Sequence, residues 1–312
     1  MRKGMLSRCG VAGVALLALV MSSSRVTQAA DADRHPDLQG VWSFATLTPL
    51  ERPAEFAGKA ELTAEEAAEF VKRSLERSDK DRRDGGGAAD VSRAYNDFWW
   101  DYGSSASRQT SLVVDPPDGR IPAMTESARL RATGYPRDDR NDNPEERGLA
   151  ERCIIGFNSG PPMMPSAYNN NVQLVQSPGT VVIVNEMIHS ARVVRLGGTH
   201  LPADMRILTG DSVGHWDGDT LVVDTTNFLK AGSVRGSSRD LHLVERFTRV
   251  NDKTLRYQFT VDDPTTWTQP WTVSMPMSLS EEPMYEYACH EGNHGLMGIL
   301  KGGRFKDSES AR

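Results

Sequence analysis

The residues with the clearest chemical capacity lie near the C-terminus, in the stretch YEYACHEGNH at residues 285–294. Its second half, HEGNH, satisfies the H-E-x-x-H pattern of zinc peptidases, in which two histidines one helical turn apart bind the metal and the glutamate activates a water. Here glycine and asparagine fill the centre of the motif and Gly295 follows, and both are poor helix-interior residues. We therefore predict no zinc peptidase and assign no metal, although the pattern leaves open whether His290 and His294 bind one.

Cys289, inside the same stretch, is one of three cysteines in the chain. Cys9 lies in a leader that we expect to be removed, which leaves Cys153 and Cys289 in the mature protein. In an oxidising compartment two cysteines most simply form one disulfide, so the sequence predicts that pairing. The alternative is a pair of buried free thiols.

Glu245 is the strongest candidate for a general acid or base. It lies between Leu243 and Phe247 on the face of a predicted strand that looks inward. A carboxylate among apolar groups is costly unless it is paired, and such a group is a plausible proton donor or acceptor for a substrate. The alternative is a buried ion pair between Glu245 and an arginine of a neighbouring strand.

Four further side chains complete the predicted catalytic group. His290 would exchange protons with Glu245, while Tyr285 and His189 would orient the substrate. Glu291 supplies a second carboxylate beside them. The hypothesis requires all five side chains to converge on one pocket.

Aromatic side chains and one histidine are the predicted walls of that pocket. The densest aromatic cluster, FWWDY at residues 98–102, suits core packing, a ligand-facing wall or a protein contact, and core packing is the simplest of the three. The predicted substrate-binding residues are Trp99, Trp100, His215, Trp216, Tyr257 and Trp271. The sequence has neither a Walker loop nor a dinucleotide-binding G-x-G-x-x-G motif, so we predict no cofactor.

The elements that must position these residues are mostly β-strands. Residues 241–247 and 255–261 alternate apolar and polar side chains around a turn at 251–253, which indicates a sheet with one wet face. Short strands with regular turns favour an antiparallel barrel or a strongly curved sheet. We expect a few peripheral helices. One starts at the capping box T-A-E-E (residues 63–66) and runs to about Arg77, and another lies near residues 295–300. Long inserted loops complete a single β-rich domain over residues 31–312, with a helical and loop insert around 60–110.

The first thirty residues have the pattern of a signal peptide, with a basic start, an apolar run over residues 10–20 and small residues before a cleavage site near residue 30. An uncleaved anchor is the alternative. Removal of four positive charges moves the formal net charge from -6 to -10. We therefore predict a secreted or periplasmic protein that has no membrane span after cleavage and does not bind nucleic acid.

Three blocks, WDGDTLVVDTTNF (216–228), LVERFTRV (243–250) and YEYACHEGN (285–293), resemble an uncharacterised family of secreted bacterial proteins. The likeness spans most of the mature chain and implies no particular reaction. The triplet Gly40-Val41-Trp42 and the strand-rich body are similar to lipocalin-like proteins, in which the tryptophan closes the barrel floor. That second resemblance implies a barrel, and includes hydratase and isomerase relatives that act on apolar molecules.

These observations lead to a functional prediction with two alternatives. The leading hypothesis is an enzyme that acts on a small, partly apolar or aromatic molecule by acid–base chemistry, as a lyase, hydratase, isomerase or hydrolase. The first alternative is a noncatalytic, lipocalin-like binding or carrier protein with the same pocket. The second is an envelope protein that contacts a partner through the aromatic cluster at residues 98–100. The partner in the first two cases is a small molecule, and no oligomeric state is predicted.

Overall fold

The computed structural model describes residues 35–79, 87, 100–134, 141–229 and 234–310. The predicted leader and Trp99 lie outside these residues. The strands are β1 (Gly40–Ser43), β2 (Val113–Asp115), β3 (Asn171–Ser177), β4 (Thr180–Asn185), β5 (Ala191–Leu196), β6 (Asp211–Asp217), β7 (Thr220–Thr226), β8 (His242–Asn251), β9 (Thr254–Asp262) and β10 (Trp271–Leu279). The helices are α2 (Ala64–Ser78), α4 (Glu126–Gly134) and α5 (His294–Ser310), with short 3-10 turns at Ala54–Phe56, Pro144–Glu146 and Met187–His189.

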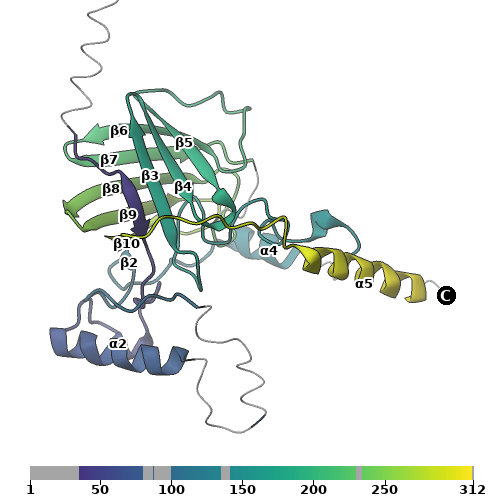
Figure 1. The fold of residues 1–312 in the computed structure, drawn as a ribbon, viewed down its shortest axis with the longest axis horizontal. Coiled ribbons are helices and arrows are strands. Elements are labelled where there is room, and N and C mark those ends of the chain that lie inside the picture. Colours follow the sequence, from purple (N-terminus) through teal and green to yellow (C-terminus); the bar gives the residue numbers. More distant parts are fainter. Residues whose placement is uncertain (1–34, 80–86, 88–99, 135–140, 230–233, 311–312) are drawn as a thin grey trace, which may run out of the picture.

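The strands form a closed barrel, which confirms the predicted mostly-β fold (Figure 1). Its strand order is β1-β3-β4-β5-β6-β7-β8-β9-β10, and the pairing of β10 with β1 closes it. Strand β2 lies outside the barrel and pairs with the beginning of β10. Neighbouring strands are antiparallel except β5 and β6, which are parallel, so residues 197–210 must run back along the barrel before β6 begins.

The alternating pattern of the sequence sets which side chains enter the barrel. In β9, Leu255, Tyr257, Phe259 and Val261 are fully buried, while the residues between them face outward, as predicted. Strand β8 follows the same rule, and β7 directs Leu221 and Val223 inward although Val222 on its other face is buried as well; both strands add their apolar residues to one continuous core. Because large aromatic side chains fill the inside, the barrel interior is a packed core.

The two ends of the barrel are closed differently. At the end where β1 begins, Trp42 is fully buried, its indole donates a hydrogen bond to the Leu38 carbonyl at 2.9 Å, and the Arg249 guanidinium lies 5.5 Å from its ring centre. At the opposite end, the segment before β3 covers the opening, with Met163 fully buried and its N–H donating to the Tyr257 hydroxyl at 3.2 Å. The interior is thereby separated from solvent at both ends.

Helices lie at the periphery of the barrel (Figure 1). Thr63 caps α2 through the predicted capping box: its side chain accepts from the Glu66 N–H, and the Glu66 carboxylate accepts from the Thr63 N–H. Helix α5 extends away from the barrel and is longer than the sequence predicted. No helix in the described ranges combines the length and apolarity needed to span a membrane.

The C-terminal segment is attached to the region around Cys153. Cys153 and Cys289 lie at disulfide distance, with 5.7 Å between their Cα atoms, as the sequence predicted. The Asn293 amide donates to the Glu151 carbonyl at 2.8 Å beside this pair. The HEGNH motif is therefore held against residues 148–154 rather than against the barrel interior.

Candidate functional site

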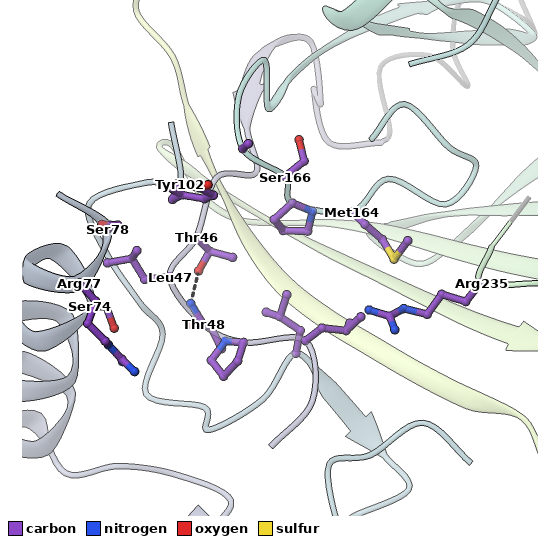
Figure 2. Close-up of a pocket in the computed structure, with 15 residues that line it drawn as sticks. Thr46, Leu47, Thr48, Ser74, Arg77, Ser78, Tyr102, Met164, Ser166 and Arg235 are labelled. Atoms are coloured by element: carbon purple, nitrogen blue, oxygen red, sulfur yellow. Dashed lines mark hydrogen bonds between the residues drawn. The ribbon is translucent and has the colours of Figure 1, made fainter. Parts of the chain in front are cut away.

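A cavity of about 560 Å³ lies where several segments distant in sequence meet (Figure 2). The chain after β1 forms one wall and the last turn of α2 forms another. The segment that covers the barrel opening and Arg235, which follows β7 in the chain, complete it. Small-molecule sites usually measure between about 300 and 1,000 Å³, so this volume suits one organic molecule.

The lining of the cavity combines apolar surface with hydroxyl groups and two cations. Its apolar part consists of Leu47, Pro49, Leu50, Leu112, Met164 and Pro165. Its hydroxyl groups belong to Thr46, Thr48, Ser74, Ser78, Tyr102 and Ser166. Arg77 and Arg235 supply the charge, and none of the described lining residues is an aspartate, a glutamate or a histidine.

Several of these hydroxyls are already committed to the protein. The Thr48 Oγ1 accepts from the Ser107 N–H at 2.9 Å, and Thr46 Oγ1 accepts from the Thr48 N–H at 3.2 Å (Figure 2). Ser166 donates to the Tyr168 carbonyl at 3.2 Å, and Ser78 donates to the Leu75 carbonyl at 3.2 Å. These bonds fix the walls of the cavity.

Tyr102 joins the cavity to the predicted aromatic cluster. Its ring stacks on Trp100 with 5.4 Å between the ring centres and 9° between the planes. Burial raises the pKa of the Tyr102 hydroxyl above its ordinary value, so this group stays protonated at neutral pH. Among the predicted wall residues that the structure describes, Trp100 is the one that contacts a lining residue of the cavity, through its stack on Tyr102.

Glu245 lies inside the barrel, away from the cavity. It is fully buried and forms a bidentate ion pair with Arg192 of β5, in which Nη2 of the arginine lies 2.9 Å from Oε1. The Tyr257 hydroxyl donates to the same carboxylate oxygen at 2.6 Å. Glu245 therefore forms the buried ion pair with an arginine that the alternative interpretation described, but the arginine comes from β5 and not from β7 or β9, the strands that adjoin β8.

Arg192 and Tyr257 complete a fully bonded polar group in the core. Arg192 Nη1 also lies 3.3 Å from the hydroxyls of Ser212 and Thr225, which bond to each other at 2.9 Å. Burial and the Glu245 charge raise the pKa of Tyr257 well above its ordinary value. These groups satisfy one another, and buried charges that are paired in this way need no ligand.

The five predicted catalytic residues do not converge. Tyr285 is 67% exposed, and His290 and Glu291 are also exposed on the segment that precedes α5. His189 is exposed at the turn between β4 and β5, whereas Glu245 is in the core. The prediction of one shared pocket was wrong, because the C-terminal segment docks on residues 148–154 and not on the barrel opening.

The residues predicted to form the aromatic walls of the pocket are also scattered over the structure. Tyr257 and Trp271 are fully buried in the barrel core, which is the packing role that large aromatic side chains usually have. Trp216 packs on the same core and stacks on His35 at 4.5 Å, and His215 faces outward. None of these four lines the cavity.

The HEGNH motif lacks the geometry of a zinc peptidase. Residues 289–292 form turns, and α5 begins only at His294, so the two histidines do not lie on one helix. In the described parts of the chain, no group of three or more His, Cys, Asp or Glu side chains is placed as a metal site.

A second motif in the chain is the string GDSVG at residues 210–214, which matches the G-x-S-x-G pattern of hydrolases. That pattern requires a sharp turn from strand to helix with the serine exposed. Ser212 lies instead within β6 and is 2% exposed, facing into the barrel. It therefore has no route to act as a nucleophile.

A network of carboxylates and imidazoles lies on the outside of the barrel. Ring nitrogens of His200 lie 3.0 Å from Asp211 and 2.9 Å from Asp224, and His242 Nε2 lies 2.8 Å from the other oxygen of Asp224. Arg195 adds two bonds to Asp211 at 2.8 and 3.1 Å. The network holds the crossing segment 197–210 against β6, β7 and β8.

Sequence reasoning missed this network. Asp224 and His242 lie on neighbouring strands, but only the register of β7 with β8 brings them within reach. His200 lies in a loop whose path cannot be read from periodicity. The sequence did offer one sign of an outer polar site. Val223 and Thr225 face inward, so Asp224 between them had to face outward.

The network predicts a pH-dependent stability. The hydrogen bond to Asp224, together with the charges of Asp224 and Asp262, raises the pKa of His242. The charged His242 therefore stabilises the folded state fully below about pH 6.5, and this stabilisation is lost as the pH rises through the raised pKa. Burial alone would raise the pKa of Asp211, but bonds from Arg195, the Leu201 N–H and His200 outweigh it and lower that pKa to about 2. The ionised Asp211 therefore stabilises the folded state above about pH 4, and this stabilisation is lost as the pH falls toward 2.

His242→Asn tests the basic limb of this dependence. Urea unfolding from pH 3 to 9 should show the largest difference between wild type and variant between about pH 4 and 6.5. The difference should shrink at higher pH, because wild-type His242 then loses its charge. A difference that grows with pH would contradict the assigned role.

Comparison with known proteins gives no family for the chain. No protein-family model matches it, and no curated protein matches it significantly. The resemblance to secreted bacterial proteins stays a prediction, and the functional argument therefore depends on the geometry of the cavity.

Proposed function

We propose that this is a noncatalytic binding protein for a small, partly apolar organic molecule. The observation that supports the proposal is the cavity of about 560 Å³ with its mixed apolar and hydroxyl lining. Such a lining holds an organic body by burial of apolar surface and orients it by a few hydrogen bonds.

The chemistry of the lining favours binding over acid–base catalysis. General acid–base catalysis needs groups that change protonation near the working pH, most often His, Asp or Glu. The described lining offers arginine, tyrosine, serine and threonine instead. Arginine stays charged, and Tyr102 has a raised pKa, so neither exchanges protons readily near pH 7.

An extracellular or periplasmic location fits the proposal. The two cysteines at disulfide distance are compatible with an oxidising compartment, and the basic and apolar leader has the pattern of a secretion signal. A binder in that compartment would capture or carry a small molecule outside the cytoplasm.

Binding can be tested with N-phenyl-1-naphthylamine, an uncharged aromatic molecule that fluoresces in apolar surroundings. We expect saturable binding to the wild type. Ser74→Trp should weaken that binding at least about tenfold, because Ser74 lines the cavity and an indole there occupies ligand volume. The measurement is a fluorescence titration at constant salt.

Ala68→Trp is the matched control, since Ala68 is exposed on the same helix and does not line the cavity. Its titration should follow that of the wild type. Absence of saturable binding to the wild type, or equal affinity in Ser74→Trp, would overturn the proposed function.

A further inference from the structure

We infer that the ligand of the cavity is an anion, namely an organic acid whose carboxylate or sulfonate is attracted by the positive charge of Arg235 and Arg77 and bonds to one of the two guanidinium groups. This inference rests on the proposed function and adds the chemical class of the ligand. Its support comes from the charges, the hydrogen-bond donors and the positions of the described lining residues.

The two arginines lie on opposite sides of the cavity (Figure 2). Arg77 belongs to the last turn of α2, and Arg235 extends toward Met164 from the segment before β8. An organic acid in the cavity would therefore lie between two guanidinium groups, with its apolar body against Leu47, Leu50 and Leu112. Arginine is suited to this role because its planar group binds carboxylate and sulfonate oxygens through paired N–H donors.

These cations are not neutralised within the site. Arg235 is exposed and makes no hydrogen bond or ion pair with any described residue. Within the described residues Arg77 donates only its Nε–H, to the Arg73 carbonyl at 3.4 Å, and its terminal N–H groups bond to none of them. By contrast Arg192, Arg195 and Arg246 each bind a carboxylate of the protein.

The other uncommitted polar groups of the cavity also suit an acceptor-rich ligand. The Tyr102 hydroxyl makes no hydrogen bond to a described residue and, like any tyrosine hydroxyl, is protonated at neutral pH, so it is available as a donor. The Ser74 hydroxyl makes no bond to the described residues and can donate as well. A carboxylate or sulfonate has only acceptors, and it is therefore complementary to this set.

The net charge of the chain gives the two arginines a specific importance. The formal charge is -6, so the protein as a whole repels an anion. An anion is attracted to the cavity only if arginines without carboxylate partners make the local potential there positive. Charge-assisted bonds at a partly enclosed site are strong enough to outweigh that repulsion.

A pair of probes that differ by one anionic group tests the inference. The probes are N-phenyl-1-naphthylamine and 8-anilinonaphthalene-1-sulfonate, which is the same aromatic amine with a sulfonate added. We expect the wild type to bind the sulfonate at least about tenfold more tightly than the amine at low salt. The preference should decline as salt is raised, because ions screen partly exposed charges.

Arg235→Gln and Arg77→Gln should each reduce the ratio of the two affinities, and the double variant should bring it to about one. Arg256→Gln makes the same charge change on the outer face of β9, and should leave the ratio at its wild-type value. Ser74→Trp should weaken binding of both probes, which shows that both occupy the cavity.

The outcomes separate the two proposals. Tight amine binding without any sulfonate preference, or a preference that survives the double arginine variant, would overturn the anion inference and leave the binding function standing. Failure of the amine to bind the wild type would overturn the binding function, and the inference with it. An equal fall of the ratio in Arg256→Gln would show that only overall charge matters and would also overturn the inference.

Discussion

Glu245→Ala is expected to lower the free energy of unfolding by about 3–5 kcal/mol. The substitution leaves the Arg192 guanidinium in the barrel core without its anion, and the Tyr257 hydroxyl loses its acceptor at 2.6 Å. An unpaired buried charge costs far more than the net value of the pair itself. Urea denaturation at pH 7 measures the loss.

The double variant Glu245→Leu with Arg192→Met is the informative control. It removes both charges together, and Ser212 and Thr225 still bond to each other at 2.9 Å. We therefore expect it to recover most of the stability lost in the single variant. A single variant that loses less than about 1 kcal/mol would contradict the structural role of the pair.

The same position separates the binding proposal from the acid–base hypothesis. If Glu245 exchanged protons with a substrate, Glu245→Gln would remove turnover in an otherwise stable protein. If Glu245 is structural, the glutamine variant is destabilised, because the charge of Arg192 is no longer balanced, while the folded fraction binds the naphthylamine probe as the wild type does.

Replacement of both Cys153 and Cys289 by serine is expected to cost about 3–5 kcal/mol of unfolding free energy. The two residues are 136 positions apart, and a bridge across so long a loop restricts the unfolded chain strongly. The folded barrel itself should persist, because its strand pairings do not involve either cysteine. Urea unfolding of the oxidised wild type and the double variant measures the difference.

Reductant provides the control for this second prediction. Dithiothreitol should bring the wild type to the stability of the double variant and leave the double variant unchanged. A wild type that does not respond to reductant would show that the two sulfurs carry no bridge, and the alternative of two free thiols would then hold.

Much of the barrel could be predicted from sequence because strand patterns are local. The alternation in residues 255–261 fixed which face of β9 enters the core, since the side-chain period of a strand is two. The capping box at Thr63 fixed the start of α2, because both of its bonds join residues three apart. The cysteine pair followed from there being two cysteines beyond the leader.

Only the tertiary structure decided the roles of the polar residues. Glu245 finds Arg192 across 53 positions of sequence, through the closed order of the barrel strands, and His200 reaches Asp224 because β5 and β6 are parallel. The cavity draws its walls from residues 46–50, α2, Tyr102, residues 164–167 and Arg235. Periodicity reports the environment of a residue along its own element, whereas ion pairs and cavities depend on which elements become neighbours when the sheet closes.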